Sequence, residues 1–157
     1  SGVGTARGYI AACEYGEDKA IFAYGYTSSA VSMSNLVNSS GVIASDVTGV
    51  GTARAEPAAC SYGSDKGIFG YGNTYHSLTN LVSSSGVIAT DTTGVGTARG
   101  SLAACEYGKD KGIFAYGFIG APNYNNESNL VSNVGVVSTD VSGVGTARRL
   151  LAACSWG

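Results

Sequence analysis

The sequence predicts an all-β protein built from a repeated unit of about 45 residues. The hexapeptide Gly-Val-Gly-Thr-Ala-Arg occurs four times and begins at Gly2, Gly49, Gly94 and Gly143. The residues between these copies are rich in β-branched and aromatic side chains and are broken by turn sequences. No stretch has a 3.6-residue apolar period long enough for a helix. With 157 residues, the chain fits one domain.

The length of the unit varies in only one segment. The first glycine of the motif lies 23 residues before the glycine of a Tyr-Gly pair in each unit. The asparagine of Asn-Leu-Val lies 14 residues before the next motif, and the steps between these two landmarks are 10, 8 and 12. Surface connections tolerate such insertions and scaffold strands do not, so we expect loops at Tyr26–Ser34, Asn73–Thr79 and Phe118–Ser128.

Each unit is expected to contain four strands separated by turns. In the first unit, Gly16–Lys19 forms the first turn, and a second turn follows the third strand at Asn38–Gly41. The predicted strands are Tyr9–Tyr15, Ala20–Tyr24, Met33–Val37 and Val42–Asp46.

A unit of four strands and this length has the size of one β-propeller blade. We therefore predict one repeat domain over residues 1–157, with blades at 2–48, 49–93 and 94–142 and a surplus first strand at 143–157. Three blades do not close a ring, so we expect assembly with copies of the same chain or a place in a longer array. The alternative is a β-trefoil, which closes as a monomer but has no place for the fourth motif.

The surplus segment is the first candidate for joining two chains. A partner's sheet edge is a suitable docking place for it, because an added strand satisfies exposed backbone groups. The residues predicted for this assembly strand are Arg148, Leu150, Leu151, Cys154 and Trp156.

The series Arg-x-x-x-Ala-Ala, Tyr-Gly and Asp-Lys-x-Ile-Phe-x-Tyr-Gly resembles the first half of a kelch blade. The whole unit is similar to repeats of tailed-phage and virion-associated structural proteins. This resemblance implies a propeller fold and a place on the virion surface or in another extracellular appendage. The chain departs from ordinary kelch repeats because its glycine pair is Tyr-Gly and the late-blade tryptophan is missing, which argues against a kelch-type enzyme.

Recurring charged residues predict a structural clamp in each unit. A planar guanidinium binds a carboxylate or turn carbonyls well, and every blade needs its corner fixed. The alternative is a ring of arginines that binds an anion. The clamp residues are Arg7, Arg54, Arg99, Asp46, Asp91 and Asp140.

No constellation of residues predicts catalysis, a metal or a cofactor. His76 is the only histidine, and no nucleophile motif surrounds it. Cys13, Cys60, Cys105 and Cys154 share one repeat position and are expected to be small buried apolar residues, with Cys13 and Cys154 the one pair to test for a disulfide.

Aromatic residues in the variable segments indicate a ligand-binding face. Rings among small polar residues suit a sugar or a flat protein surface. The candidates are Tyr26, Tyr75, His76, Phe118 and Tyr124. Asn38 and Asn126 stand in weak acceptor sequences for N-glycosylation.

Charge and hydropathy argue against two classes of function, nucleic-acid binding and a membrane-spanning role through a helix. Nine basic and eleven acidic residues are scattered, which argues against nucleic-acid binding, and no apolar run is long enough for a membrane helix. The chain opens without Met or a signal sequence, so we expect a processed chain or part of a longer one. We expect a non-enzymatic structural or adhesive fibre subunit that binds itself; the alternative is a lectin that binds a cell-surface glycan.

Overall fold

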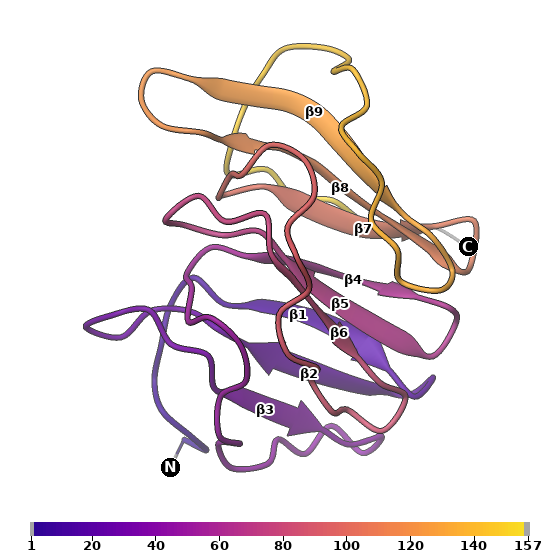
Figure 1. The fold of residues 1–157 in the computed structure, drawn as a ribbon. Helices are drawn as coiled ribbons and strands as arrows, with labels where there is room; N and C mark the ends of the chain where they lie inside the picture. The colour runs from indigo at the N-terminus through magenta and orange to yellow at the C-terminus, as the bar shows by residue number, and fades with distance from the viewer. Residues whose placement is uncertain (1, 156–157) are drawn as a thin grey trace.

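The computed structural model describes residues 2–155, and this part of the chain is all-β. Its strands form three antiparallel sheets of three strands, one sheet in each sequence unit, and chain order equals strand order (Figure 1). The strands are β1 (Ala11–Tyr15), β2 (Lys19–Ala23), β3 (Ser34–Val37), β4 (Ala58–Tyr62), β5 (Lys66–Gly70), β6 (Thr79–Val82), β7 (Ala103–Tyr107), β8 (Lys111–Phe118) and β9 (Tyr124–Val131). The all-β prediction is confirmed.

Left-handed residues set the ends of the first two strands in the first and second units. Tyr9 has φ 54° and Tyr24 has φ 62°, which an extended strand cannot accommodate. β1 therefore begins at Ala11 rather than at Tyr9, and β2 ends at Ala23. Between the two strands, Gly16 and Glu17 are also left-handed and close the hairpin.

The predicted fourth strand is wrong as a regular strand. In the first unit it is reduced to two isolated bridges, Val37 to Ile43 and Ser34 to Val47. We call the residues that follow the second turn of a unit, 42–47 in the first unit, its outer segment. The bridged residues are three positions apart on β3 but four apart on the outer segment. The outer segment therefore has one extra residue, and the ladder of hydrogen bonds is broken there. The Asn35 side chain uses the freed Ala44 carbonyl, to which its Nδ2 donates at 3.1 Å.

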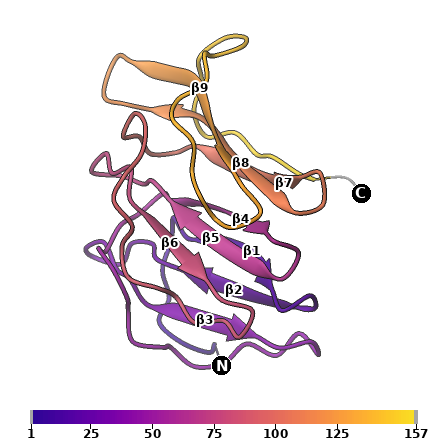
Figure 2. The same ribbon diagram turned by 45° about the vertical axis from the view of Figure 1, so that its right-hand side comes forward.

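The three sheets follow one another in a row, with β1 beside β4 and β4 beside β7 (Figures 1 and 2). Apolar side chains fill the two spaces between sheets. The first cluster contains Ile21, Tyr24 and Phe69, and the second contains Ile68 and Phe114 with Tyr71. The core therefore lies between units rather than inside any one of them.

The segment after the third sheet runs beside that sheet without forming a strand. Residues 143–155 have no ladder pairing within the single chain, so their predicted pairing with a partner's sheet edge stays a prediction, and Trp156 lies outside the described residues. The equivalent strands β1, β4 and β7 each pair with the strand that follows them. Among the described residues no strand follows β9, so residues 143–155 have no such partner strand there.

The third variable segment is shorter as a loop than predicted. β8 and β9 extend into it as a hairpin in which Phe118 pairs with Tyr124, after a register shift between Ala115 and Gly117. The first two variable segments are loops that contain one isolated bridge, Tyr26 to Ala30. Among the described residues there is no helix that could span a membrane.

Candidate functional site

Each unit clamps its own arginine against its outer segment. Arg7 Nη2 donates to Asn35 Oδ1 at 2.7 Å, and Arg7 Nε donates to the Tyr24 carbonyl at 2.9 Å. Arg7 Nη1 lies 3.5 Å from Asp46 Oδ1. The corresponding sets in the other units are Arg54 with Asn80 and Asp91, and Arg99 with Asn129 and Asp140.

The carboxylate of the clamp is held by the motif of its own unit. The backbone N–H and the hydroxyl of Thr5 donate to Asp46 Oδ2 at 2.9 and 2.7 Å. These bonds and one from Asn35 Nδ2 hold the pKa of Asp46 below its usual range. Gly4 has φ 77°, and a Cβ there would lie 2.6 Å from Asp46 Oδ1. The second glycine of the motif is therefore required by the clamp.

Burial and hydrogen bonding oppose each other at the clamp of the second unit. Burial acts to raise the pKa of Asp91, but hydrogen bonds from Thr52 and Asn80 and the charge of Arg54 lower it. Asp140 shows the same balance in the third unit. The Arg54 and Arg99 side chains are fully buried, which favours the structural clamp over an anion-binding ring.

The aspartate of a clamp does not pair with the arginine that follows it eight residues later in the sequence. Asp46 stands eight residues before Arg54, yet it pairs with Arg7, the arginine of its own unit. Sequence reasoning missed Asn35, which the structure places between the two charges. The signal was present, because an Asn-Leu-Val triplet recurs in all three units.

Neighbouring units bind each other through a recurring set of contacts. The Arg54 Cζ lies 4.0 Å from the ring centre of Tyr24, and the Phe69 ring packs edge-on against the same tyrosine at 5.4 Å. The Gly25 N–H donates to the Arg54 carbonyl at 3.0 Å. Arg99, Tyr71 and Phe114 repeat this arrangement between the second and third units.

Residues 143–155 reproduce part of this contact on the third unit. Arg148 Cζ lies 4.3 Å from the Tyr116 ring centre, and the Gly117 N–H donates to the Arg148 carbonyl at 2.9 Å. The Tyr116 hydroxyl donates to the Val144 carbonyl at 3.0 Å, as Tyr24 does to Val50. Within residues 2–155, no phenylalanine packs edge-on against Tyr116 as Phe69 does against Tyr24. Leu150 and Cys154 are exposed, and Leu151 is half-buried.

The first sheet exposes the face that the other sheets bury. We call this the leading face; in the first unit it contains Ile10, Phe22 and Ile43. Ile10 is 41% exposed, whereas its equivalent Leu102 is 7% exposed against the second unit. The leading face of the first unit, with Val3 and Arg7, lines a hollow of about 260 Å³.

The third sheet exposes the opposite face. We call this the trailing face; in the third unit it contains Tyr107, Ile113 and Tyr116. Tyr107 is 39% exposed, whereas its equivalent Tyr62 is 3% exposed beneath the next unit. Ile113 is only half-buried, whereas Ile68 is completely buried. Residues 143–155 thus cover this face incompletely.

The four cysteines line one shared groove and form no disulfide within the described residues. Cys13 and Cys60 are buried, Cys105 is half-buried, and Cys154 is exposed. Burial raises the pKa of the Cys13 thiol to about 12 and also raises that of Cys60. Glu14 and Glu106 lie in the same groove, and the pKa of Glu106 is raised by its burial and then by Glu14.

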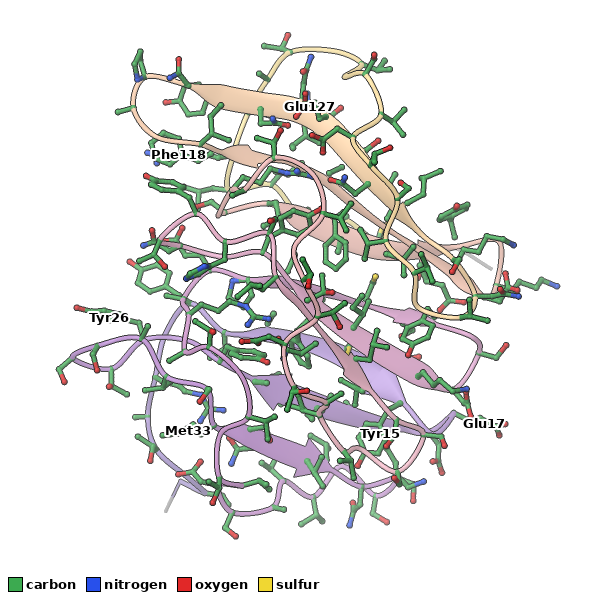
Figure 3. The ribbon with its side chains drawn as sticks, in the orientation of Figure 1. Tyr15, Glu17, Tyr26, Met33, Phe118 and Glu127 are labelled. Atoms are coloured by element: carbon green, nitrogen blue, oxygen red, sulfur yellow. The ribbon has the colours of Figure 1, made fainter. Side chains whose placement is uncertain are left out.

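The variable segments gather at one edge of the molecule. Figure 3 shows Tyr26 and Phe118 at this edge, with Tyr15 and Glu17 at the opposite edge. The structure brings Tyr75, Phe118 and Tyr124 together, because the Tyr75 and Phe118 ring centres lie 6.2 Å apart and those of Phe118 and Tyr124 lie 5.8 Å apart.

Other residues predicted for this edge lie apart from the three rings. Tyr26 is exposed and makes no aromatic pair in the part of the chain that the structure describes. His76 is half-buried, and its backbone N–H donates to the Gly72 carbonyl at 3.4 Å. Sequence reasoning missed Arg149, whose Cζ lies 4.3 Å from the Phe118 ring centre. The signal was its position, because the residue after the motif arginine is Gly or Ala in the other copies.

The two predicted glycosylation asparagines have different surroundings. Asn38 is exposed, and its Oδ1 accepts bonds from the N–H groups of Ser40 and Val42 at 3.0 and 2.9 Å. Asn126 is half-buried, and its Nδ2 donates to the Gly145 carbonyl at 2.9 Å. The amide nitrogen that a glycan would occupy is therefore already bonded at Asn126.

Comparison with known proteins adds no family. No protein-family model matches the sequence, and no curated protein is significantly similar to it. Among residues 2–155, no group of His, Cys, Asp and Glu side chains is arranged to hold a metal ion. Function must therefore be argued from the geometry of the units.

Proposed function

We propose that the chain is a non-enzymatic structural subunit whose units stack as the blades of a kelch-like β-propeller and which assembles with further copies of itself. A virion surface or another extracellular appendage is the setting that the repeat resemblance favours. The observation that carries the proposal is the pair of open end faces. The leading face of the first unit and the trailing face of the third have the chemistry that these faces bury between units.

The two open faces are complementary rather than identical. Inside the chain, the trailing Tyr24 packs against the leading Phe69 and stacks beneath Arg54. Tyr116 on the trailing face of the third unit and Phe22 on the leading face of the first are both half-buried, and neither makes an aromatic pair among the described residues. A contact between copies is therefore heterologous, and it either closes a ring or continues as a filament.

In such a contact, two segments would compete for the same place on the third unit. In the proposed contact, residues 143–155 already occupy the place of residues 2–14 of the added copy, because the bond from Gly117 to Arg148 corresponds to that from Gly25 to Arg54. We infer that the segment of the first copy remains and pairs with β2 of the added copy in place of β1. The sequence Ala-Ala-Cys at 152–154 matches Ala-Ala-Cys at 11–13, so the exchanged strand keeps its side chains.

Two charged variants test the heterologous contact. Phe22→Asp places a carboxylate on the leading face, and Tyr107→Asp places one on the trailing face. Each variant retains one intact face, so each is expected to be monomeric alone, while a mixture of the two forms a dimer with one joint. Light-scattering mass and analytical ultracentrifugation measure both states, and circular dichroism checks that each variant is folded.

Val87→Asp is the matched control for added charge. Val42, Val87 and Val136 occupy the same repeat position and are 61%, 64% and 64% exposed, so stacking does not cover this position. The control is expected to assemble like the unmodified chain. A mixture of Phe22→Asp and Tyr107→Asp that stays monomeric would overturn the proposal, as would unchanged assembly of either variant alone.

A further inference from the structure

We propose that Tyr75, Phe118, Tyr124 and Arg149 form a binding site for a carbohydrate that carries a carboxylate group. The site lies at the loop edge, away from the trailing-face residue Tyr107, and its test is separate from that of assembly. Its residues come from three parts of the chain: the loop between β5 and β6, the β8–β9 hairpin and the segment after the fourth motif.

The aromatic rings form a tilted, partly exposed surface. Tyr75 and Phe118 are inclined by 56°, and Phe118 and Tyr124 by 47°, so the rings do not stack flat on one another. Tyr75 and Tyr124 are both exposed, whereas Phe118 between them is half-buried. Exposed rings of this kind present apolar area together with a polar hydroxyl, which suits the two sides of a sugar ring.

The backbone at Tyr75 departs from the repeat. Thr74 has φ 69° and Tyr75 has φ 56°. Within residues 2–155, every other non-glycine residue with positive φ has a counterpart at the same position of another unit, as Tyr24 has in Tyr71 and Tyr116. A bulky residue in this region is strained, so this strain belongs to one loop and is not needed to build the unit.

Arg149 is not part of a clamp, and its positive charge is not paired with a carboxylate of the described residues. Its Cζ lies 4.3 Å from the Phe118 ring centre and 5.7 Å from that of Tyr124. Within the described residues, no carboxylate lies within 4.0 Å of its guanidinium, in contrast to the three clamped arginines. The other copies have Gly8, Ala55 and Gly100 at this position, so a long cationic side chain is not a requirement of the unit.

The two features select one class of ligand. A guanidinium that lies over an aromatic ring keeps its N–H groups at the edge, where they can bind a carboxylate through two parallel hydrogen bonds. Uronic and sialic acids carry a carboxylate on a rigid ring that also has an apolar face. The sugar ring would pack on Tyr75 and Tyr124 while its carboxylate binds Arg149.

Two acidic sugars and their neutral derivatives test this proposal. A galacturonate tetramer and a sialylated trisaccharide are each titrated calorimetrically into the full chain, next to the corresponding methyl ester, which keeps the ring and removes the charge. We expect at least one acid to bind at least tenfold more tightly than its ester. Arg149→Gln should weaken that binding at least tenfold, Arg149→Lys should weaken it less, and Tyr75→Ala should abolish it.

Two matched variants separate this site from general effects of charge and aromatic area. Lys109→Gln removes an exposed cation from the β7–β8 turn, which belongs to the opposite edge, and Tyr26→Ala removes an exposed ring from the loop edge. Both should bind as the unmodified chain does, and the mass and circular dichroism of all variants should be unchanged.

Three results would overturn the proposal. The first is that neither acid binds more tightly than its ester, and the second is that Arg149→Gln leaves the affinity unchanged. The third is that a short acidic peptide binds as tightly as the sugars, which would show that the site recognises the carboxylate alone.

Discussion

The first and second units have closely related sequences but different environments. Phe69 is completely buried against Tyr24, whereas Phe22 at the same position is half-buried and has no ring against it within residues 2–155. The difference comes from the neighbour, because the second unit has a sheet on both faces and the first has one on a single face. Burial at these positions is thus a property of the stack, as in other repeat proteins whose units share their cores.

The first unit also lacks a polar cap. Terminal units of repeat proteins usually carry a polar outer face, which keeps the array soluble. Here the outer face presents Ile10, Phe22 and Ile43 around a hollow. The apolar leading face of the first unit therefore supports the proposal that it receives another unit.

The largest expected difference between the first and second units is in the stability that is lost when Phe22 or Phe69 is replaced. Phe69→Ala leaves a cavity in a packed core and should lower the free energy of unfolding by about 3–5 kcal/mol. Phe22→Ala, measured in the monomeric Tyr107→Asp background, should cost less than about 1.5 kcal/mol because the side chain is half-buried there. Urea denaturation measures both; equal losses would mean that the neighbouring unit does not set the burial.

A smaller difference in lost stability is expected when the clamp arginines of the two units are replaced. Arg7 and Arg54 each donate to an asparagine of their own unit, and Arg7 Nε also donates to the Tyr24 carbonyl, whereas the buried Arg54 Nε has no partner among the described residues. Of the two, Arg54 is the one that stacks on a tyrosine of a preceding unit. Replacing either by Met should destabilise the chain, and Arg54→Met should cost about 1–2 kcal/mol more, which is the range for a desolvated cation–π contact. The same denaturation experiment gives the difference, and a loss at Arg7 as large as that at Arg54 would exclude a contribution from stacking.

The clamps also predict how stability depends on pH. Because the pKa values of Asp46, Asp91 and Asp140 are lowered in the folded chain, the unfolded chain takes up protons first as the pH falls. The stability from these carboxylates is complete above about pH 5, where the unfolded groups are fully ionised, and is lost as the pH falls through the folded values. Asp91→Asn should flatten this acid loss in a pH series of urea denaturation curves; an unchanged slope would contradict the assignment.

The repeats made much of the fold predictable, whereas features that depend on individual contacts in the folded chain were not predictable. The recurring turn sequences located the hairpin between the first two strands of each unit and the variable segments, because these landmarks recur at fixed steps. The broken fourth strand was not predictable, since it depends on one extra residue and on Asn35 taking the Ala44 carbonyl. Arg149 was missed for a related reason, because only the folded hairpin brings Phe118 beneath it.

The reactivity of the cysteines tests the same difference in burial between units, and it requires no substitution in the core. Cys60 lies between two units and Cys154 lies after the last, although both occupy the same position in the repeat. At pH 8 in the monomeric Tyr107→Asp variant, a thiol reagent should modify Cys154 first and Cys105 more slowly, because buried thiols are inert. Cys13 and Cys60 should react only after urea unfolds the chain, as mass spectrometry of peptides would show. Early modification of Cys60 would contradict the packing between units.

The mass of the unmodified chain in solution tests the central claim most directly. Light scattering over a wide concentration range is expected to give multiples of 15.8 kDa, either as one closed oligomer or as a series that grows with concentration. Electron micrographs of the same samples would separate rings from filaments. A monomer at every concentration would show that the two open faces do not bind each other and would contradict the account.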